Sequence, residues 1–74
     1  MKITYDPEAD ALYVLIRAGD AADSVDIEDG VTADLDSAGH ILGLEVLDAS
    51  KKMTSEELTS VSYENLLLAA SAID

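Results

Sequence analysis

The sequence contains no cysteine, and only four of its 74 residues are basic. Without cysteine, the chain can form neither a disulfide framework nor a zinc site built on thiolates. Sixteen acidic residues against four basic ones give a formal net charge of −12. A surface of this charge repels a phosphate backbone, so we expect no direct binding of nucleic acid. No apolar run approaches the roughly 20 residues of a membrane-spanning helix, so we expect no membrane partner either.

The chain nevertheless contains enough apolar material for one small folded domain. Hydrophobic residues make up 49% of it, which argues against disorder despite the high net charge. A length of 74 residues fits a single domain over residues 1–74, with a marginal core and no room for an enclosed substrate cavity. The residues after Met1 lack the apolar stretch of a secretory signal, so the expected location is the cytoplasm.

Short segments of alternating or β-forming residues predict five strands. They cover residues 3–5, 11–16, 21–28, 31–35 and 40–47. Turn-forming residues separate them: Asp6-Pro7 after the first, Asp29-Gly30 after the third, and the segment 36–39 after the fourth. Gly43, inside the last strand, predicts a bulge or a close approach by another group. The predicted fold is therefore α+β, a small twisted antiparallel meander of about five strands with a C-terminal helix packed on or beside the sheet.

The region after residue 47 changes in composition and predicts helix. Thr54 or Ser55, followed by acidic residues, is typical of a helix start. We expect a helical turn over residues 55–58, a short extended piece, and a helix from about 64 to 72. A single helix over residues 55–73 is the alternative that the spacing of apolar residues leaves open.

Several segments resemble a small prokaryotic family, the YuzE-like family or domain of unknown function 2283. They are residues 2–13, Asp29-Gly30-Val31, Asp34-Leu35-Asp36 with Gly39, and residues 41–51, whose sequence is ILGLEVLDASK. The resemblance covers about residues 2–52 and implies a small sheet-plus-helix domain with no established activity and no catalytic residues. Some members are thought to be encoded beside small toxin-like proteins, which implies an antitoxin-like or partner role.

Acidic residues gather in the predicted third and fourth strands and in the turn between them. From Arg17 to Lys51 the sequence has nine acidic residues and no basic one between. Such a surface favours electrostatic steering of a basic partner. The candidate partner-binding residues are Asp26, Glu28, Asp29, Asp34 and Asp36. We therefore predict a non-enzymatic interaction module for a small basic protein; a solvated acidic face that only keeps the domain soluble is the alternative.

The first turn offers a second hypothesis, a divalent-cation site. Asp6, Glu8 and Asp10 place three carboxylates at alternate positions, and hard cations such as Ca²⁺ take several oxygen ligands. The glycine and glutamate that a calcium-binding EF-hand loop would need further along are replaced by Ala11 and Arg17. A structural turn explains the same residues.

Catalysis is not expected. Paired carboxylates on an exposed sheet face lack the desolvation that would separate their pKa values. The one histidine, His40, lies at a predicted turn and has Ser37 nearby but no glycine-flanked serine elbow. No cofactor is expected. Tyr5 and Tyr13 are predicted to lie on one face of the first hairpin as a cross-strand pair.

The third hypothesis is a purely structural homo-oligomer. The core of so short a chain is small, and three successive leucines at residues 66–68 exceed what one sheet face can cover. We therefore expect a homodimer, or a complex with a small basic protein, more than a monomer.

Overall fold

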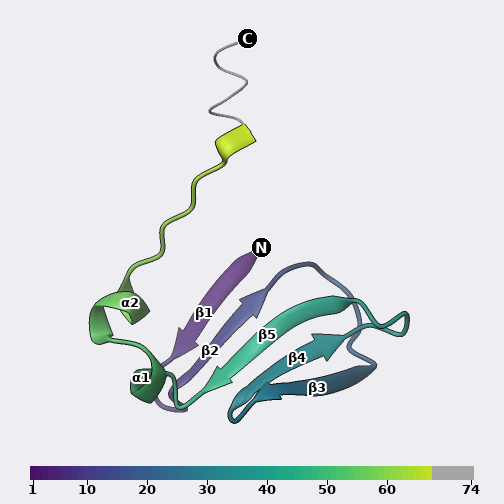
Figure 1. Cartoon of the computed structure of the whole chain (residues 1–74), viewed down its shortest axis with the longest axis horizontal. Coiled ribbons are helices and arrows are strands. Elements are labelled where there is room, and N and C mark those ends of the chain that lie inside the picture. The colour runs from purple at the N-terminus through teal and green to yellow at the C-terminus, as the bar shows by residue number, and fades with distance from the viewer. Residues whose placement is uncertain (68–74) are drawn as a thin grey trace.

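The computed structural model describes residues 1–67 as five strands followed by two short helices. The strands are β1 (Lys2–Asp6), β2 (Ala11–Leu15), β3 (Asp23–Glu28), β4 (Val31–Leu35) and β5 (Ile41–Leu47), all in one antiparallel sheet (Figure 1). The predicted α+β class and the five-stranded antiparallel sheet are confirmed.

The order of the strands across the sheet is β1-β2-β5-β4-β3. Three hairpins join neighbours in sequence: β1 with β2, β3 with β4, and β4 with β5. The one departure from consecutive order is that β2 pairs with β5. The last strand therefore lies at the centre of the sheet, and β1 and β3 form its two edges.

The turns have the backbone that their residues predicted. Gly30 and Gly39 both adopt positive φ angles, of 79° and 85°, which glycine takes without the steric cost of a side chain. Asp36 stabilises the turn between β4 and β5, because its Oδ1 accepts hydrogen bonds from the backbone N–H groups of Ala38 and His40, each at 2.9 Å. Aspartate side chains commonly accept hydrogen bonds from backbone N–H groups in turns, where these groups have no partner strand.

The helices are shorter than the longest alternative predicted. Helix α1 (Ala49–Lys52) follows β5 almost directly and was not expected, whereas α2 (Ser55–Thr59) matches the predicted helical turn. Thr54 is the N-cap of α2, as predicted, in a reciprocal capping box with Glu57. The chain becomes extended at Ser60, with φ −134° and ψ 127°, so a single helix over residues 55–73 is wrong.

Beyond Ser60 the described chain is extended to residue 65 and leads away from the sheet, past the N-terminal end of β1 (Figure 1). Residues 66 and 67 are helical, which agrees with the start of the helix predicted over 64–72. The rest of that predicted helix lies outside the described residues.

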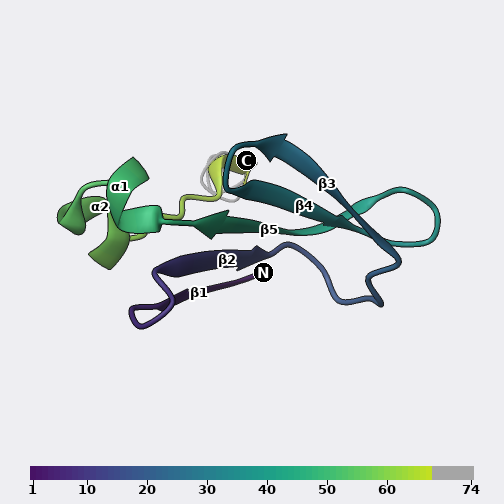
Figure 2. The same cartoon turned by 90° about the horizontal axis from the view of Figure 1, so that it is seen from below.

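The described part of the chain forms one layer of sheet with the two helices beside one end of it (Figures 1 and 2). Few side chains are fully buried in such an arrangement: among the described hydrophobic residues only Ala33, Leu42 and Ala49 are at most 3% exposed. Within residues 1–67 no helix is long and apolar enough to cross a membrane.

Candidate functional site

The pairing register sorts the side chains of the sheet onto two faces. Residues directly opposite each other in antiparallel strands project to the same side, and neighbours along a strand project to opposite sides. We call one side the apolar face: its two rows across the sheet are Ile3, Val14, Leu44, Ala33 and Val25, and Tyr5, Leu12, Val46 and Val31. We call the other side the polar face: its rows are Lys2, Leu15, Gly43, Asp34 and Ser24, and Thr4, Tyr13, Glu45, Thr32 and Asp26.

The apolar face is only partly covered by the described residues. Its central strands contribute half-buried side chains and the buried Ala33, whereas Ile3 and Val25, on the two edge strands, are 40% and 45% exposed. Ile27, the residue without a register partner in the bulge of β3, is 58% exposed. Large exposed apolar patches occur at interaction sites, at ligand-binding grooves and at aggregation-prone surfaces.

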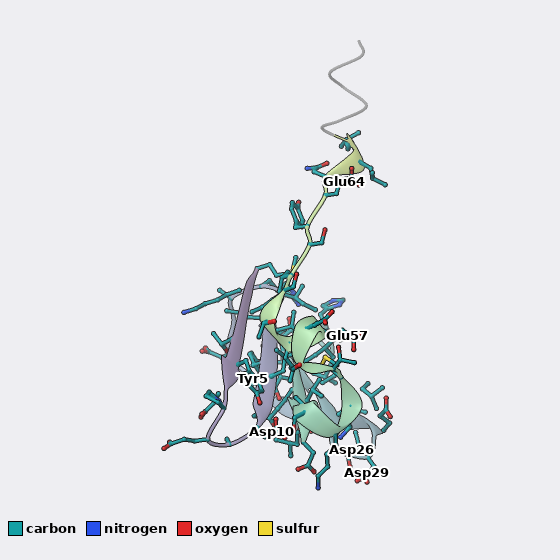
Figure 3. All side chains as sticks on the ribbon, turned by 90° about the vertical axis from the view of Figure 1, so that its left-hand side faces the viewer. Tyr5, Asp10, Asp26, Asp29, Glu57 and Glu64 are labelled. Carbon is teal, nitrogen blue, oxygen red and sulfur yellow. The ribbon has the colours of Figure 1, made fainter. Side chains whose placement is uncertain are left out.

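The five predicted partner-binding residues do not form one cluster. The structure brings Asp26 and Asp34 together on the polar face. Glu28 instead opposes Val31, because a bulge after Asp26 shifts the register, and Asp29 lies in the turn (Figure 3).

Asp36 makes its hydrogen bonds and its ion pair within the fold. Besides the two turn amides, it accepts a hydrogen bond from the Arg17 guanidinium at 2.7 Å, which is also an ion pair. The backbone N–H of His40 is the largest cause that lowers the pKa of the Asp36 carboxyl, and Arg17 is the second. The charged form of Asp36 therefore stabilises its turn.

One acidic residue of the polar face escaped the sequence prediction. Glu45 lies in β5, opposite Thr32 of β4, which separates it from Asp26 in β3, and its side chain is exposed. The alternation of Glu45 with Leu44 and Val46 is a signal that it faces solvent. Its position beside β4 follows only from the strand order, because β5 is central.

Tyr13 crosses the polar face above Gly43. Its hydroxyl donates a hydrogen bond to Asp34 Oδ2 at 2.8 Å, which spans from β2 over β5 to β4. A Cβ atom at Gly43 would lie 2.7 Å from Cζ of Tyr13 and 2.8 Å from the Val14 carbonyl oxygen. The close approach predicted at Gly43 is thus made by a tyrosine ring, and the hydrogen bond to Asp34 is the largest cause that raises the pKa of Tyr13.

Tyr5 and Tyr13 do not form the predicted pair, because they lie on opposite faces. Tyr5 is opposite Leu12, and Tyr13 is opposite Thr4. The turn between β1 and β2 contains four residues, and in the resulting register Tyr13 is one residue beyond the position opposite Tyr5. Its side chain therefore projects to the other face. The prediction failed because it placed them by their distance from the turn rather than by the register.

Asp10 joins the first hairpin to the helices. Its Oδ1 accepts hydrogen bonds from the Tyr5 hydroxyl at 2.7 Å and from the Ser50 backbone N–H at 3.0 Å, and its Oδ2 accepts one from the Ser50 hydroxyl at 2.6 Å. Figure 3 shows Tyr5 and Asp10 on the part of the hairpin next to the helices. Hydrogen bonds from the Ser50 side chain, and then from Tyr5, lower the pKa of Asp10. The backbone of Asp10 also contacts the first residue of α1, because the Asp10 carbonyl oxygen accepts a hydrogen bond from the N–H of Ala49 at 3.0 Å.

Asp6 and Asp10, two of the three carboxylates of the predicted cation site, make different structural hydrogen bonds. Asp6 Oδ1 accepts the backbone N–H groups of Glu8 and Ala9, at 3.0 and 3.4 Å, which is the turn arrangement weighed against the cation site. Asp10 is bonded to Tyr5 and Ser50. Within residues 1–67 no group of three or more histidine, cysteine, aspartate or glutamate side chains lies close enough together to hold a metal ion.

A family model described as "Protein of unknown function (DUF2283)" matches residues 2–50 of the chain. That range begins with β1 and ends at Ser50, so it contains the whole sheet, the Tyr13 hydrogen bond over Gly43 and the Asp10 contacts with α1. No curated protein and no solved structure matches the chain.

Proposed function

The chain belongs to the family of proteins of unknown function DUF2283, whose description gives no activity, and we propose a function on the basis of the surfaces that its fold exposes. The protein is a non-enzymatic protein–protein interaction module that docks its partner on the apolar face. The observation that supports this is the single layer of sheet, whose row from Ile3 to Val25 lacks a second layer among the described residues. Stable domains bury such a face against another layer.

The charged groups support a role without catalysis. A general acid or base works best with a pKa near the operating pH, which for a carboxyl requires a raised pKa. The carboxyls of Asp10, Asp36 and Glu57 instead have lowered pKa values, each caused mainly by hydrogen bonds to the charged form. These contacts lie in turns and at a helix start, where they fasten the fold.

A native-cell pull-down tests the proposal with matched baits. Ile3→Lys/Val25→Lys places two positive charges on the apolar face, and Thr4→Lys/Ser24→Lys places the same charges one residue along the same strands, on the polar face. Circular dichroism first establishes that both variants are folded. We expect the wild type and the polar-face variant to retain the same protein and the apolar-face variant to lose it. Equal retention by all three baits would contradict the proposal.

The polar face offers a second candidate function, the binding of a small basic protein in an antitoxin-like role. Asp26, Asp34 and Glu45 lie on this face, and the one basic side chain at its register positions is Lys2, on the far edge strand. We expect Asp26→Lys/Glu45→Lys to abolish binding of the product of an adjacent gene, and added salt to weaken it. Affinity that is insensitive to both changes would exclude this electrostatic role.

The cation site and the cytoplasmic location stay predictions. A calorimetric titration with Ca²⁺, Mg²⁺ and Mn²⁺ tests the site: heat that is lost in Asp6→Asn would support it, and no heat would exclude it. The hydrogen bonds already made by Asp6 and Asp10 favour the structural turn.

A further inference from the structure

We propose that the free edge of β1 is a self-pairing surface, on which a second copy of this chain adds its own β1 in the antiparallel direction. The two-fold axis passes at Thr4, and the two five-stranded sheets become one continuous sheet. Within residues 1–67, β1 pairs only with β2, so the outer side of its backbone has no partner strand. Such an edge is a template for a further strand. The association uses the edge of the sheet and does not depend on what docks on the apolar face.

The two edges of the sheet differ in how well they are protected against pairing with another chain. β3 contains a bulge between Asp26 and Glu28, and its three acidic residues have no basic residue among them. A bulge twists an edge away from a further strand, and like charges placed opposite each other destabilise a pair. β1 pairs with β2 over five consecutive residues without a register shift, and Lys2 and Asp6 balance its charge. The edge at which two acidic chains can meet is therefore β1.

The sequence of β1 is complementary to itself in the antiparallel direction. With Thr4 opposite its own copy, Lys2 lies opposite Asp6 of the second copy, and Ile3 lies opposite Tyr5. Opposite charges, a β-branched residue with an aromatic one, and two threonines are cross-strand combinations that stabilise a sheet. A two-fold interface uses the same patch on both subunits, so the charged pair and the apolar pair each occur twice. All five positions of β1 therefore gain a suitable partner.

An open groove lies where this arrangement brings the turn of the second copy. The groove has a volume of about 690 Å³ and is lined by Met1, Ile3 and the segment 61–63. Figure 1 shows the extended chain of that segment passing the N-terminal end of β1. Met1 precedes the first paired residue, so Pro7 of the second copy, which follows the last paired residue, would come next to it. The contact can thus extend beyond the five paired residues.

Single cysteines test the arrangement without interference, because the chain contains no cysteine. Opposite residues of antiparallel strands have Cα atoms about 4.5–5.5 Å apart, which is within the range that a disulfide bridges. Under mild oxidation of the full chain, we expect Thr4→Cys to form a disulfide-linked dimer. Ser24→Cys is the matched control, because it places the same thiol on the polar face of the other edge strand, and it should remain largely monomeric. Equal crosslinking of the two variants would overturn the proposal.

An exchange of charges tests the register. Lys2→Glu places glutamate opposite Asp6 of the second copy, and Asp6→Lys places two lysines opposite each other. In sedimentation over a range of concentrations, each variant alone should dimerise roughly tenfold more weakly than the wild type, because two favourable pairs become repulsive. An equimolar mixture of the two should recover the wild-type affinity, since each chain then supplies the opposite charges for the other.

Matched controls place the same changes of charge away from β1. Lys51→Glu lies in α1 and Asp23→Lys in β3, and their mixture should dimerise no better than either variant alone. Circular dichroism first establishes that each variant is folded. Asp6→Lys removes an acceptor from the first turn; if it does not fold, Lys2→Glu and the two cysteine variants still decide the question.

The wild type gives the plainest outcome. A chain that sediments as a monomer up to about 1 mM overturns the inference, as does a mixture of Lys2→Glu and Asp6→Lys that is no tighter than its components. Thr4→Lys/Ser24→Lys places like charges at the two-fold axis, so it should lose the dimer and yet keep a partner that docks on the apolar face. A monomeric wild type whose pull-down still depends on the apolar face refutes the pairing of β1 and leaves the proposed function standing.

Discussion

Replacing Gly43 by alanine should destabilise the sheet, although strand preferences favour the opposite result. A glycine inside a strand costs about 0.5–1 kcal/mol relative to alanine through backbone entropy. At Gly43, however, the added Cβ would lie 2.7 Å from Cζ of Tyr13 and 2.8 Å from the carbonyl oxygen of Val14. Forcing extra volume into a packed site costs about 1–3 kcal/mol. Moving the ring also endangers the hydrogen bond to Asp34, which contributes about 1 kcal/mol.

The net expected loss in the free energy of unfolding is about 2 kcal/mol, because steric cost and the lost hydrogen bond exceed the entropic gain. For a domain of this size that corresponds to a fall in the thermal midpoint of roughly 10 °C. Urea unfolding followed by circular dichroism measures it, with protein concentration held fixed so that self-association does not change the comparison.

A double-mutant cycle separates the tyrosine ring from the other effects. In a Tyr13→Thr background the ring is absent, so the cost of Gly43→Ala should fall by about 1 kcal/mol, leaving the contact with the Val14 carbonyl. Gly39→Ala is the control: its cost comes from a φ of 85° with open space around it, so it should be the same in both backgrounds. A neutral or stabilising Gly43→Ala, or an absence of coupling to Tyr13, would refute the reasoning.

Three further predictions concern the polar contacts. Hydrogen bonds lower the pKa values of Asp10 and Asp36, so the stability that these carboxylates provide is present above the ordinary value near 3.8 and is lost as pH falls through the lowered pKa values. In Asp10→Asn the urea midpoint of unfolding should therefore fall less steeply at acidic pH than in the wild type. An unchanged pH dependence would argue against this role of Asp10. Thr54→Ala should increase amide exchange at Glu57 several-fold by removing the cap of α2, while exchange in the sheet stays the same. Arg17→Gln should change stability by less than about 1 kcal/mol, because the ion pair is exposed, and Asp36→Ala should shift the unfolding midpoint further because the turn amides lose their acceptor.

Local chemistry made the strands and turns predictable. Alternating residues around Val25 and Ala33 need only a two-residue period, and Gly30 and Gly39 need only the steric freedom of glycine. The cap at Thr54 likewise depends on residues within one turn of helix. Helix α1 escaped prediction because four residues carry no periodic pattern.

The positions of the predicted partner-binding residues on the fold depend partly on the strand register. The bulge after Asp26 directs Glu28 toward the apolar side, and Asp36 is used by its own turn. Glu45 joins the polar face only because β5 pairs with both β2 and β4. The positions of Glu28 and Glu45 cannot be read from spacing along the chain, whereas the turn at Asp36 is local.

The sequence by itself determined the excess of acid, the absence of cysteine, the five strands, the turns and the cap of α2, since each depends on composition or on residues a few positions apart. Tertiary structure alone decided which strand is central, which tyrosine reaches Asp34, and how Asp10 fastens α1 to the first hairpin. It also decided that the apolar row from Ile3 to Val25 remains partly open. The physical reason is that pairing between distant strands sets the faces of a sheet, and a single-residue difference in register moves a side chain from one face to the other.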